Sequence, residues 1–251
     1  MADKGSYLAL IGPACHRCRM TADSTHQGRV ALVTGGARGL GVEVCRQLAQ
    51  AGMQVWCAAR DLTRAEEVAE SMRTDGDVRA AQLDVADESS VLALAGRVER
   101  LDVLVNNAAI DYDTDARALT IDLDRVRRDL ETNLLGAWRM AQAFSDQLRA
   151  SRHGRLVNVS SGAGQISVMG AGTPAYSISK LSLNGLTRML ADELRPDGVL
   201  VNAVCPGWTA TDMGGGGRPV PEGARSITWA CLLPDDGPTG GFFRDGRPLA
   251  W

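Results

Sequence analysis

The stretch TGGARGLG, at residues 34–41, decides the fold of this chain of 251 residues. It directly follows the apolar run VALV at residues 30–33, and apolar residues at helical spacing follow it until Gly52 ends the helix. A glycine-rich turn between a buried strand and a helix lets the backbone approach a pyrophosphate, and the start of the helix offers unpaired N–H groups. This context predicts a dinucleotide site, although close packing of a strand on a helix also selects glycine.

Strand-like and helix-like segments alternate along the rest of the chain. The predicted strands cover residues 30–33, 55–58, 78–83, 103–105, 156–159 and 199–204, and the predicted later helices cover 63–74, 87–98, 119–150 and 174–194. Because these strands are apolar throughout instead of alternating, we predict a parallel sheet that is covered on both faces. The fold class is therefore α/β, with a single Rossmann-type doubly wound parallel sheet of about seven strands and helices on both faces. Ligands of such sheets bind beyond the carboxyl ends of the strands.

The length of the chain suits one large domain, which we place at residues 28–251. Residues 1–27 are polar without a clear period and are expected to form a disordered arm, in which Met20 is a second candidate for the native start. Cys15 and Cys18 have the spacing of a metal site but lack further ligands at suitable spacing, so no metal is expected. The six cysteines are spread over the whole chain, which argues against a disulfide framework.

Composition excludes several kinds of partner. The formal net charge is -3 and no run of Lys or Arg occurs, so no nucleic-acid partner is expected. No stretch reaches the roughly 18 apolar residues of a membrane span. The apolar run at residues 7–11 is also shorter than the core of a secretory signal. We expect a cytoplasmic protein that does not bind membranes.

Further motifs follow the glycine-rich turn in a fixed order. They are Asp84-Val85, Asn106-Asn107-Ala108-Ala109, Asn133, Ser161, Tyr176-x-x-x-Lys180 and Pro206-Gly207. With these motifs, the chain resembles the short-chain dehydrogenase/reductase family over about residues 29–251. Its tail, residues 237–251, resembles the carbonyl-reductase branch, in which this segment supplies the last strand and closes the sheet.

The residues after the second strand indicate which form of the cofactor binds. NAD-binding proteins place a carboxylate there to accept the hydroxyl groups of the adenosine ribose. Here Ala59 is followed by Arg60, and Arg38 lies inside the glycine-rich turn. Two guanidinium groups suit a 2′-phosphate, so the sequence favours NADP(H). The alternative is that Arg60 pairs with Asp61 or Glu66 on the surface.

The resemblance also implies the other cofactor contacts. Asp84 and Val85 would hold the adenine, although Asp84 is also a candidate helix cap, a role that Asp87 fits better. The remaining predicted cofactor residues are Gly35, Gly39, Leu40 and Gly41 in the turn, Asn106 and Ala108 along the adenosine ribose, Tyr176 and Lys180, and Pro206, Gly207 and Thr211 near the nicotinamide.

Tyr176 and Lys180 are four residues apart, so on a helix their side chains project from the same face. An ammonium group and a positive nicotinamide both favour the phenolate and lower a tyrosine pKa from about 10, which suits acid–base catalysis. The resemblance implies that Lys180 also holds the nicotinamide ribose and that Ser161 polarises the substrate carbonyl, with Ser160 as its rival. It also implies that Asn133 anchors a water in the proton relay; the alternative is a polar residue that caps a helix kink.

These residues predict transfer of a hydride from NADPH to a ketone or aldehyde, or the reverse oxidation of a secondary alcohol. The resemblance implies that the pro-S hydride is transferred. The loops at 110–118, 162–173 and 208–220 carry few charges, so we expect a neutral, fairly apolar substrate. Two alternatives keep the cofactor site: non-redox chemistry, such as a cyclisation or dehydration, and a non-catalytic regulator that binds the cofactor. The resemblance implies a homodimer or homotetramer that assembles through helices 119–150 and 174–194, and the sequence leaves the choice open.

Overall fold

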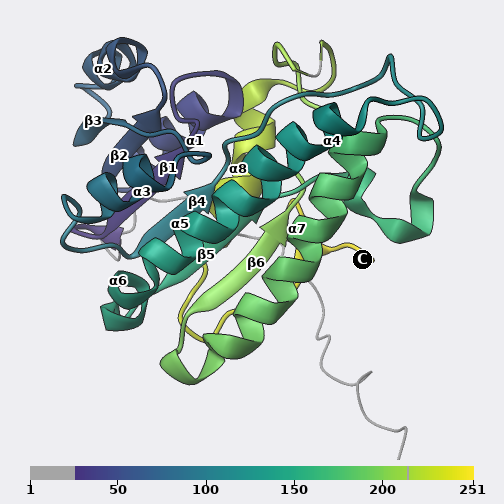
Figure 1. Cartoon of the computed structure of the whole chain (residues 1–251). Coiled ribbons are helices and arrows are strands. Elements are labelled where there is room, and N and C mark those ends of the chain that lie inside the picture. The colour runs from purple at the N-terminus through teal and green to yellow at the C-terminus, as the bar shows by residue number, and fades with distance from the viewer. Residues whose placement is uncertain (1–25, 214) are drawn as a thin grey trace, which may run out of the picture.

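The computed structural model describes residues 26–213 and 215–251, and in this part of the chain the strands form one sheet of order β3-β2-β1-β4-β5-β6-β7-β8 (Figure 1). Every neighbouring pair is parallel except β7 and β8. The strands are β1 (Val30–Thr34), β2 (Gln54–Ala59), β3 (Val78–Gln82), β4 (Val103–Asn106), β5 (Arg155–Val159), β6 (Leu200–Val204), β7 (Phe242–Arg244) and β8 (Arg247–Pro248). The predicted doubly wound parallel sheet is confirmed, and the tail adds the parallel strand β7 and the short antiparallel strand β8.

Helices cover both faces of this sheet. They are α1 (Gly39–Gln50), α2 (Leu62–Ser71), α3 (Glu88–Ala95), α4 (Leu123–Leu130), the π-helix η2 (Glu131–Gly136), α5 (Ala137–Ala143), α6 (Ser145–Ala150), α7 (Pro174–Glu193) and α8 (Val220–Cys231). Short 3-10 turns are η3 (Gly162–Gly164), η4 (Ile166–Val168) and η5 (Arg195–Asp197). One core joins the sheet to α1 and α8, and the other joins it to α3, α5 and α7. Both faces of β1, β4, β5 and β6 are therefore buried, which explains their continuous apolar sequences.

The segment predicted as one helix over residues 119–150 is shorter and interrupted. It begins at Leu123, widens into a π-helix around Asn133 and breaks again at Phe144. The backbone of the π-helix lies close to Val85 at Gly136, because a Cβ on this glycine would lie 2.7 Å from the Val85 side chain. Insertions of this kind mark places where a side chain forms bonds outside its own helix.

Helix α8 was not predicted from the sequence. It starts at Val220 with a proline in its first turn, a position that proline suits because the first N–H groups have no partner within the helix. Gly223 follows, and a Cβ there would lie 2.6 Å from the Thr209 hydroxyl oxygen. Proline and glycine obscure the helical pattern in the sequence, although both fit the packing of this helix.

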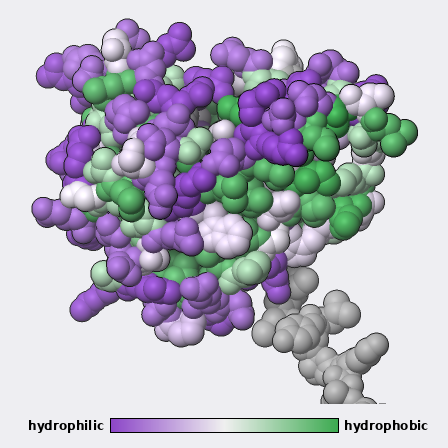
Figure 2. All heavy atoms as spheres, viewed as in Figure 1, coloured by the Kyte–Doolittle hydropathy of each residue, from purple (hydrophilic) through white to green (hydrophobic). Residues whose placement is uncertain are grey.

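Several sequence expectations fall outside the described residues. The proposed disordered arm at 1–27 lies there except for its last two residues, as do Met20, Cys15 and Cys18. In the described part of the chain, four free cysteines are all buried, and no helix is long and apolar enough to cross a membrane. Figure 2 shows the same side of the molecule as Figure 1. On this side, apolar side chains gather at the surface over α4 and α7.

Candidate active site

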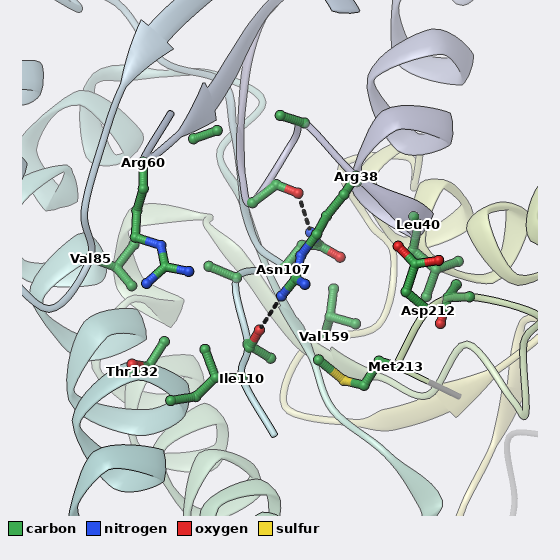
Figure 3. A pocket seen from close by; sticks show the side chains of 18 of the residues that line it. Arg38, Leu40, Arg60, Val85, Asn107, Ile110, Thr132, Val159, Asp212 and Met213 are labelled. Atoms are coloured by element: carbon green, nitrogen blue, oxygen red, sulfur yellow. Dashed lines mark hydrogen bonds between the residues drawn. The ribbon is translucent and has the colours of Figure 1, made fainter. Parts of the chain in front are cut away.

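Most of the predicted site residues meet at one cleft at the carboxyl ends of the central strands (Figure 3). The cleft has a volume of about 370 Å³. The predicted residues that line it are Gly35, Arg38, Gly39, Leu40, Gly41, Arg60, Asp84, Val85, Ala108, Tyr176, Lys180, Pro206 and Thr211. Strand order reverses at β1 and β4, and the cleft lies at this switch point, where doubly wound sheets bind their ligands.

Asn106 is placed in the interior of the protein and does not line the cleft. It is 4% exposed, and its side-chain amide donates to the Ala137 carbonyl at 3.2 Å and to Asn158 Oδ1 at 2.9 Å. These bonds tie β4 to α5 and β5. Gly207 also lies outside the residues that line the cleft, in a left-handed backbone conformation beside the Arg218 side chain.

The neighbouring Asn107 lines the cleft instead (Figure 3). Its side-chain amide donates to the carbonyls of Thr34 at 2.9 Å and Gly35 at 3.1 Å. The backbone N–H of Asn107 in turn donates to the Thr34 hydroxyl. Asn107 therefore fixes the glycine-rich turn to the end of β4, a role that sequence reasoning did not assign to it.

The glycine-rich turn brings two backbone segments into contact. A Cβ on Gly41 would lie 2.1 Å from the Gly35 carbonyl oxygen, and Gly35 itself has a φ of 64°, which favours glycine. Helix α1 begins at Gly39, and no side chain caps it. Its first N–H groups therefore lack a side-chain acceptor at the cleft, which is the arrangement that binds phosphate at helix N-termini.

Positive charge gathers at the same end of the cleft. Arg38 Nη2 donates to the Ala109 carbonyl at 3.3 Å, and the Arg60 side chain points into the cleft (Figure 3). Asp61 caps α2 and lies 3.7 Å from Arg64, so it does not pair with Arg60. Arg60 forms no ion pair with any carboxylate of residues 26–213 or 215–251, Glu66 included.

Asp84 and Val85 follow β3 and border the cleft from another side. Asp84 Oδ1 accepts a hydrogen bond from the Ala86 N–H at 3.0 Å and does not cap a helix. Asp87 caps α3 by accepting from the Ser89 N–H at 2.9 Å. The helix cap is therefore Asp87, and Asp84 lines the cleft.

Tyr176 and Lys180 lie one helical turn apart on α7, and both are buried. Lys180 Nζ donates to the Val159 carbonyl at 2.8 Å and lies 5.6 Å from the centroid of the Tyr176 ring. Burial lowers the pKa of Lys180 to about 8. Burial raises the pKa of Tyr176, and a hydrogen bond with Ser161 opposes that rise. In the protein alone, loss of solvation thus outweighs the predicted lowering of the tyrosine pKa.

The two rival serines have different surroundings. Ser161 caps the turn η3 by accepting from the Ala163 N–H at 3.2 Å, and its hydroxyl acts on Tyr176 by lowering the pKa of the phenol. Ser160 is 2% exposed and donates to the Lys180 carbonyl at 3.4 Å. Ser160 is among the residues that line the cleft, whereas Ser161 is not. The hydroxyl beside the phenol belongs to Ser161, which is the residue favoured from the sequence.

Asn133 lies in the π-helix and uses its whole side-chain amide. Oδ1 accepts from the Ile110 N–H at 2.9 Å, while Nδ2 donates to the Ile110 carbonyl at 3.2 Å and to Ser179 Oγ at 3.0 Å. Ser179 donates in turn to the Tyr176 carbonyl at 2.7 Å. Asn133 therefore joins the segment after β4 to the helix that carries Tyr176 and Lys180.

Sequence reasoning missed Asp113, which is fully buried. Its carboxylate accepts from the N–H groups of Ala175 at 2.9 Å and Tyr176 at 3.2 Å. Thr173, at the start of α7, has a φ of 47°, and its side chain accepts no hydrogen bond from the N–H groups of the helix. A distant loop thus caps the helix that carries Tyr176 and Lys180, and no local sequence signal reveals it.

An aromatic wall continues outward from Tyr176. The Tyr112 ring meets the Tyr176 ring edge-on with centroids 5.1 Å apart, and its centroid lies 5.5 Å from that of the Trp208 ring. Trp208 is 54% exposed. A Cβ on Gly217 would lie 2.2 Å from the Trp208 ring, so this glycine leaves the space that the ring needs. Of these three rings, Tyr176 lines the cleft, and Tyr112 and Trp208 extend the aromatic contact away from it.

The comparisons with known proteins agree with this fold. The family model described as short chain dehydrogenase matches residues 29–219. The chain is 36% identical to (+)-neomenthol dehydrogenase of Arabidopsis thaliana, over 86% of this chain and 95% of that protein. It is 37% identical to a 3-oxoacyl-(acyl-carrier-protein) reductase of Aquifex aeolicus, over 74% of this chain and 76% of that protein.

Solved structures give the same result. The NADPH-bound carbonyl reductase from chicken fatty liver is 27% identical and has a TM-score of 0.80, with 90% of this chain and 100% of that chain covered. The chain therefore belongs to the short chain dehydrogenase family of oxidoreductases, as its motifs predicted.

Proposed function

We propose that the protein is an NADP(H)-dependent carbonyl reductase or alcohol dehydrogenase that moves a hydride between the nicotinamide and a neutral ketone, aldehyde or secondary alcohol. The observation that carries the proposal is a single cleft with two functional ends. The glycine-rich turn and two arginines border one end, and Tyr176 and Lys180 border the other.

The residues present fit NADP(H). The approach of Gly41 to the Gly35 carbonyl leaves no room for a side chain, and the uncapped start of α1 offers N–H groups to a pyrophosphate. Arg38 and Arg60 would hold the 2′-phosphate, because Arg60 has no carboxylate partner in the described part of the chain. Asp84 would hold the adenine. When bound, the cofactor supplies or accepts the hydride; the family resemblance implies the pro-S hydrogen.

In carbonyl reduction, Tyr176 donates its hydroxyl proton to the carbonyl oxygen as negative charge develops there. Ser161, whose hydroxyl lowers the pKa of the phenol, donates to the same oxygen and stabilises that charge. Lys180, with a pKa of about 8, is mostly an ammonium at neutral pH and stabilises the phenolate that remains. The Val159 carbonyl holds the Lys180 ammonium in place.

Asn133 is the fourth member of the proposed tetrad, and we assign it a role in positioning the others. Its bonds to Ile110 and Ser179 fix the cleft wall relative to α7, and the proposed relay water would lie between this region and Lys180. The Tyr176 proton is restored from solvent through Lys180 in this scheme. Oxidation of an alcohol follows the reverse path.

Charge pairing near the substrate region supports a neutral substrate. Arg125 forms ion pairs with Asp111 and Asp115, and Arg218 forms two hydrogen bonds of 2.9 Å with Asp245. Arg218 and Asp245 thus balance each other, and Arg125 balances one of its two carboxylate partners, so no unpaired positive charge among these groups attracts an anionic substrate. With the wall of Tyr112, Trp208 and Tyr176, they favour a neutral, apolar ketone of the kind that the name neomenthol dehydrogenase indicates for a relative.

The absorbance of NADPH during incubation with carbonyl compounds tests this function. We expect oxidation of NADPH with cyclohexanone or a larger cyclic ketone, and a much lower rate with a charged keto acid. Tight NADPH binding without turnover over a broad panel would favour the non-catalytic regulator. Product formation without a change in NADPH would favour cyclisation or dehydration.

Assembly as a homodimer or homotetramer through the helices at 119–150 and 174–194 remains a prediction, as does the cytoplasmic location. Exposed apolar side chains on these helices, among them Leu123, Trp138 and Met189, support the assembly. Light scattering of the eluted protein gives its mass directly. A mass of one chain at micromolar concentration would contradict the prediction.

A further inference from the structure

Asp129 is a buried carboxyl group that the proposed reaction does not use. It lies in the last turn of α4 and is 1% exposed. Its Oδ2 is buried without a hydrogen-bond partner among residues 26–213 and 215–251. Arg125, one turn earlier on the same helix, is committed to Asp111 and Asp115. A buried carboxyl oxygen without a hydrogen-bond partner is destabilising, most of all when the group is charged, so its presence calls for a physical role.

The surroundings of Asp129 link it to the catalytic pair. Helix α4 packs against α7, which carries Tyr176 and Lys180. Charged or titratable groups on three elements interact with Asp129. They are Arg125 and Arg128 on α4, Asp111 and Asp113 in the segment after β4, and Tyr176 and Lys180 on α7. The other two carboxylates have donors of their own, since Asp111 bonds to Arg125 and Asp113 accepts from two backbone N–H groups.

The sign of the coupling follows from this arrangement. Burial, followed by the charges of Asp111 and Asp113, raises the pKa of Asp129 to about 7. The group is therefore a neutral acid below that pH and a carboxylate above it. A carboxylate at this place raises the pKa of both Tyr176 and Lys180, because negative charge nearby disfavours the phenolate and favours the ammonium.

We propose that Asp129 is a positioning residue for the reacting proton: its buried charge keeps that proton on Tyr176 and Lys180 and biases the site toward carbonyl reduction. The proposal rests on the proposed function. Reduction needs the phenol as a proton donor, whereas oxidation needs the phenolate as an acceptor. Ionised Asp129 therefore extends reduction to higher pH and moves the onset of alcohol oxidation to higher pH.

The pH profiles of kcat/KM test this role, with cyclohexanone and NADPH in one direction and cyclohexanol and NADP⁺ in the other. In Asp129→Asn, we expect the alkaline limb of reduction and the acidic limb of oxidation to move to lower pH by about half a unit or more. Asp129→Glu keeps the charge and should keep the wild-type profile. Asp124→Asn is the matched control, because its carboxylate lies on the same helix but is 69% exposed and screened by solvent.

Profiles of Asp129→Asn within about 0.2 units of the wild type, or an equal shift in Asp124→Asn, overturn the proposal. If Asp129→Asn does not fold, Asp129→Leu removes the same charge and suits apolar surroundings.

An infrared titration without substrate separates this proposal from the proposed function. The wild-type protein should show a carboxylic acid band that disappears as the pH rises through about 7, and the band should be missing from Asp129→Asn or Asp129→Leu. A wild-type protein in which no such band is present at about pH 5 overturns the proposal. If the wild type reduces no ketone, the proposed function fails, and the infrared result still decides how Asp129 ionises.

Discussion

Replacement of Asp113 by alanine removes the carboxylate that caps α7 from a distant loop. Two hydrogen bonds are lost, from the Ala175 N–H at 2.9 Å and from the Tyr176 N–H at 3.2 Å, and both donors belong to the first turn of the helix. A bond from a backbone N–H to a charged acceptor contributes about 1.5 kcal/mol or more, and loss of a helix cap costs about 1 kcal/mol. The Thr173 side chain offers no capping bond to the helix in exchange. We expect the free energy of unfolding to fall by about 3 kcal/mol.

Urea unfolding at neutral pH, followed by circular dichroism, measures this change. With a slope of about 3 kcal/mol per molar urea for a chain of this size, the midpoint should fall by about 1 M. Asp113→Asn keeps one acceptor oxygen and should show about half the effect. Asp115→Ala is the matched control, because this nearby carboxylate is 74% exposed and its ion pair is screened by solvent, so its loss should leave the midpoint nearly unchanged. Equal midpoints for Asp113→Ala and Asp115→Ala would refute the capping role.

Three further variants test other parts of the site. Arg60→Ala should weaken NADPH binding about tenfold and leave NADH binding unchanged in a fluorescence titration, because only NADPH carries the 2′-phosphate; an equal loss for both cofactors would contradict this role. Gly41→Ala places a Cβ 2.1 Å from the Gly35 carbonyl oxygen, so it should weaken both cofactors by at least about tenfold, and unchanged affinity would show that the turn is not the pyrophosphate site. The raised pKa of Asp129 means that folding binds a proton between about pH 4 and 7, so the wild-type free energy of unfolding decreases through this window as the pH rises. Asp129→Asn should lose that slope and gain about 1–3 kcal/mol relative to the wild type above pH 7, as measured by urea unfolding at several pH values; parallel slopes would contradict the assignment.

The fold could be predicted from the sequence where the residues of an element themselves determine its structure. Strands β1, β4, β5 and β6 are buried on both faces, so their apolar runs predict their positions within one or two residues. The π-helix could not be predicted in this way, because the Asn133 side chain bonds to Ile110, 23 residues away. Helix α8 was also not predicted, because its proline and glycine suit contacts that form only in the folded chain.

The candidate site likewise contains residues that the sequence predicts and residues that only the structure reveals. The spacing of Tyr176 and Lys180 predicted a shared helix face, and the structure places both at the cleft. The pleat at the end of β4 decides which asparagine points toward the glycine-rich turn: Asn106 turns into the core and Asn107 turns toward the cleft. Asp113 lies more than 60 residues from the helix that it caps, so only the folded chain reveals its role.

The rate of ketone-dependent NADPH oxidation by Tyr176→Phe tests the central claim most directly, with NADPH affinity measured on the same protein. Removal of one hydroxyl leaves the ring in its contact with Tyr112 and removes the proton donor. The account predicts that kcat falls by about a thousandfold while NADPH affinity changes less than about threefold. A kcat within about tenfold of the wild type would show that another group protonates the carbonyl oxygen.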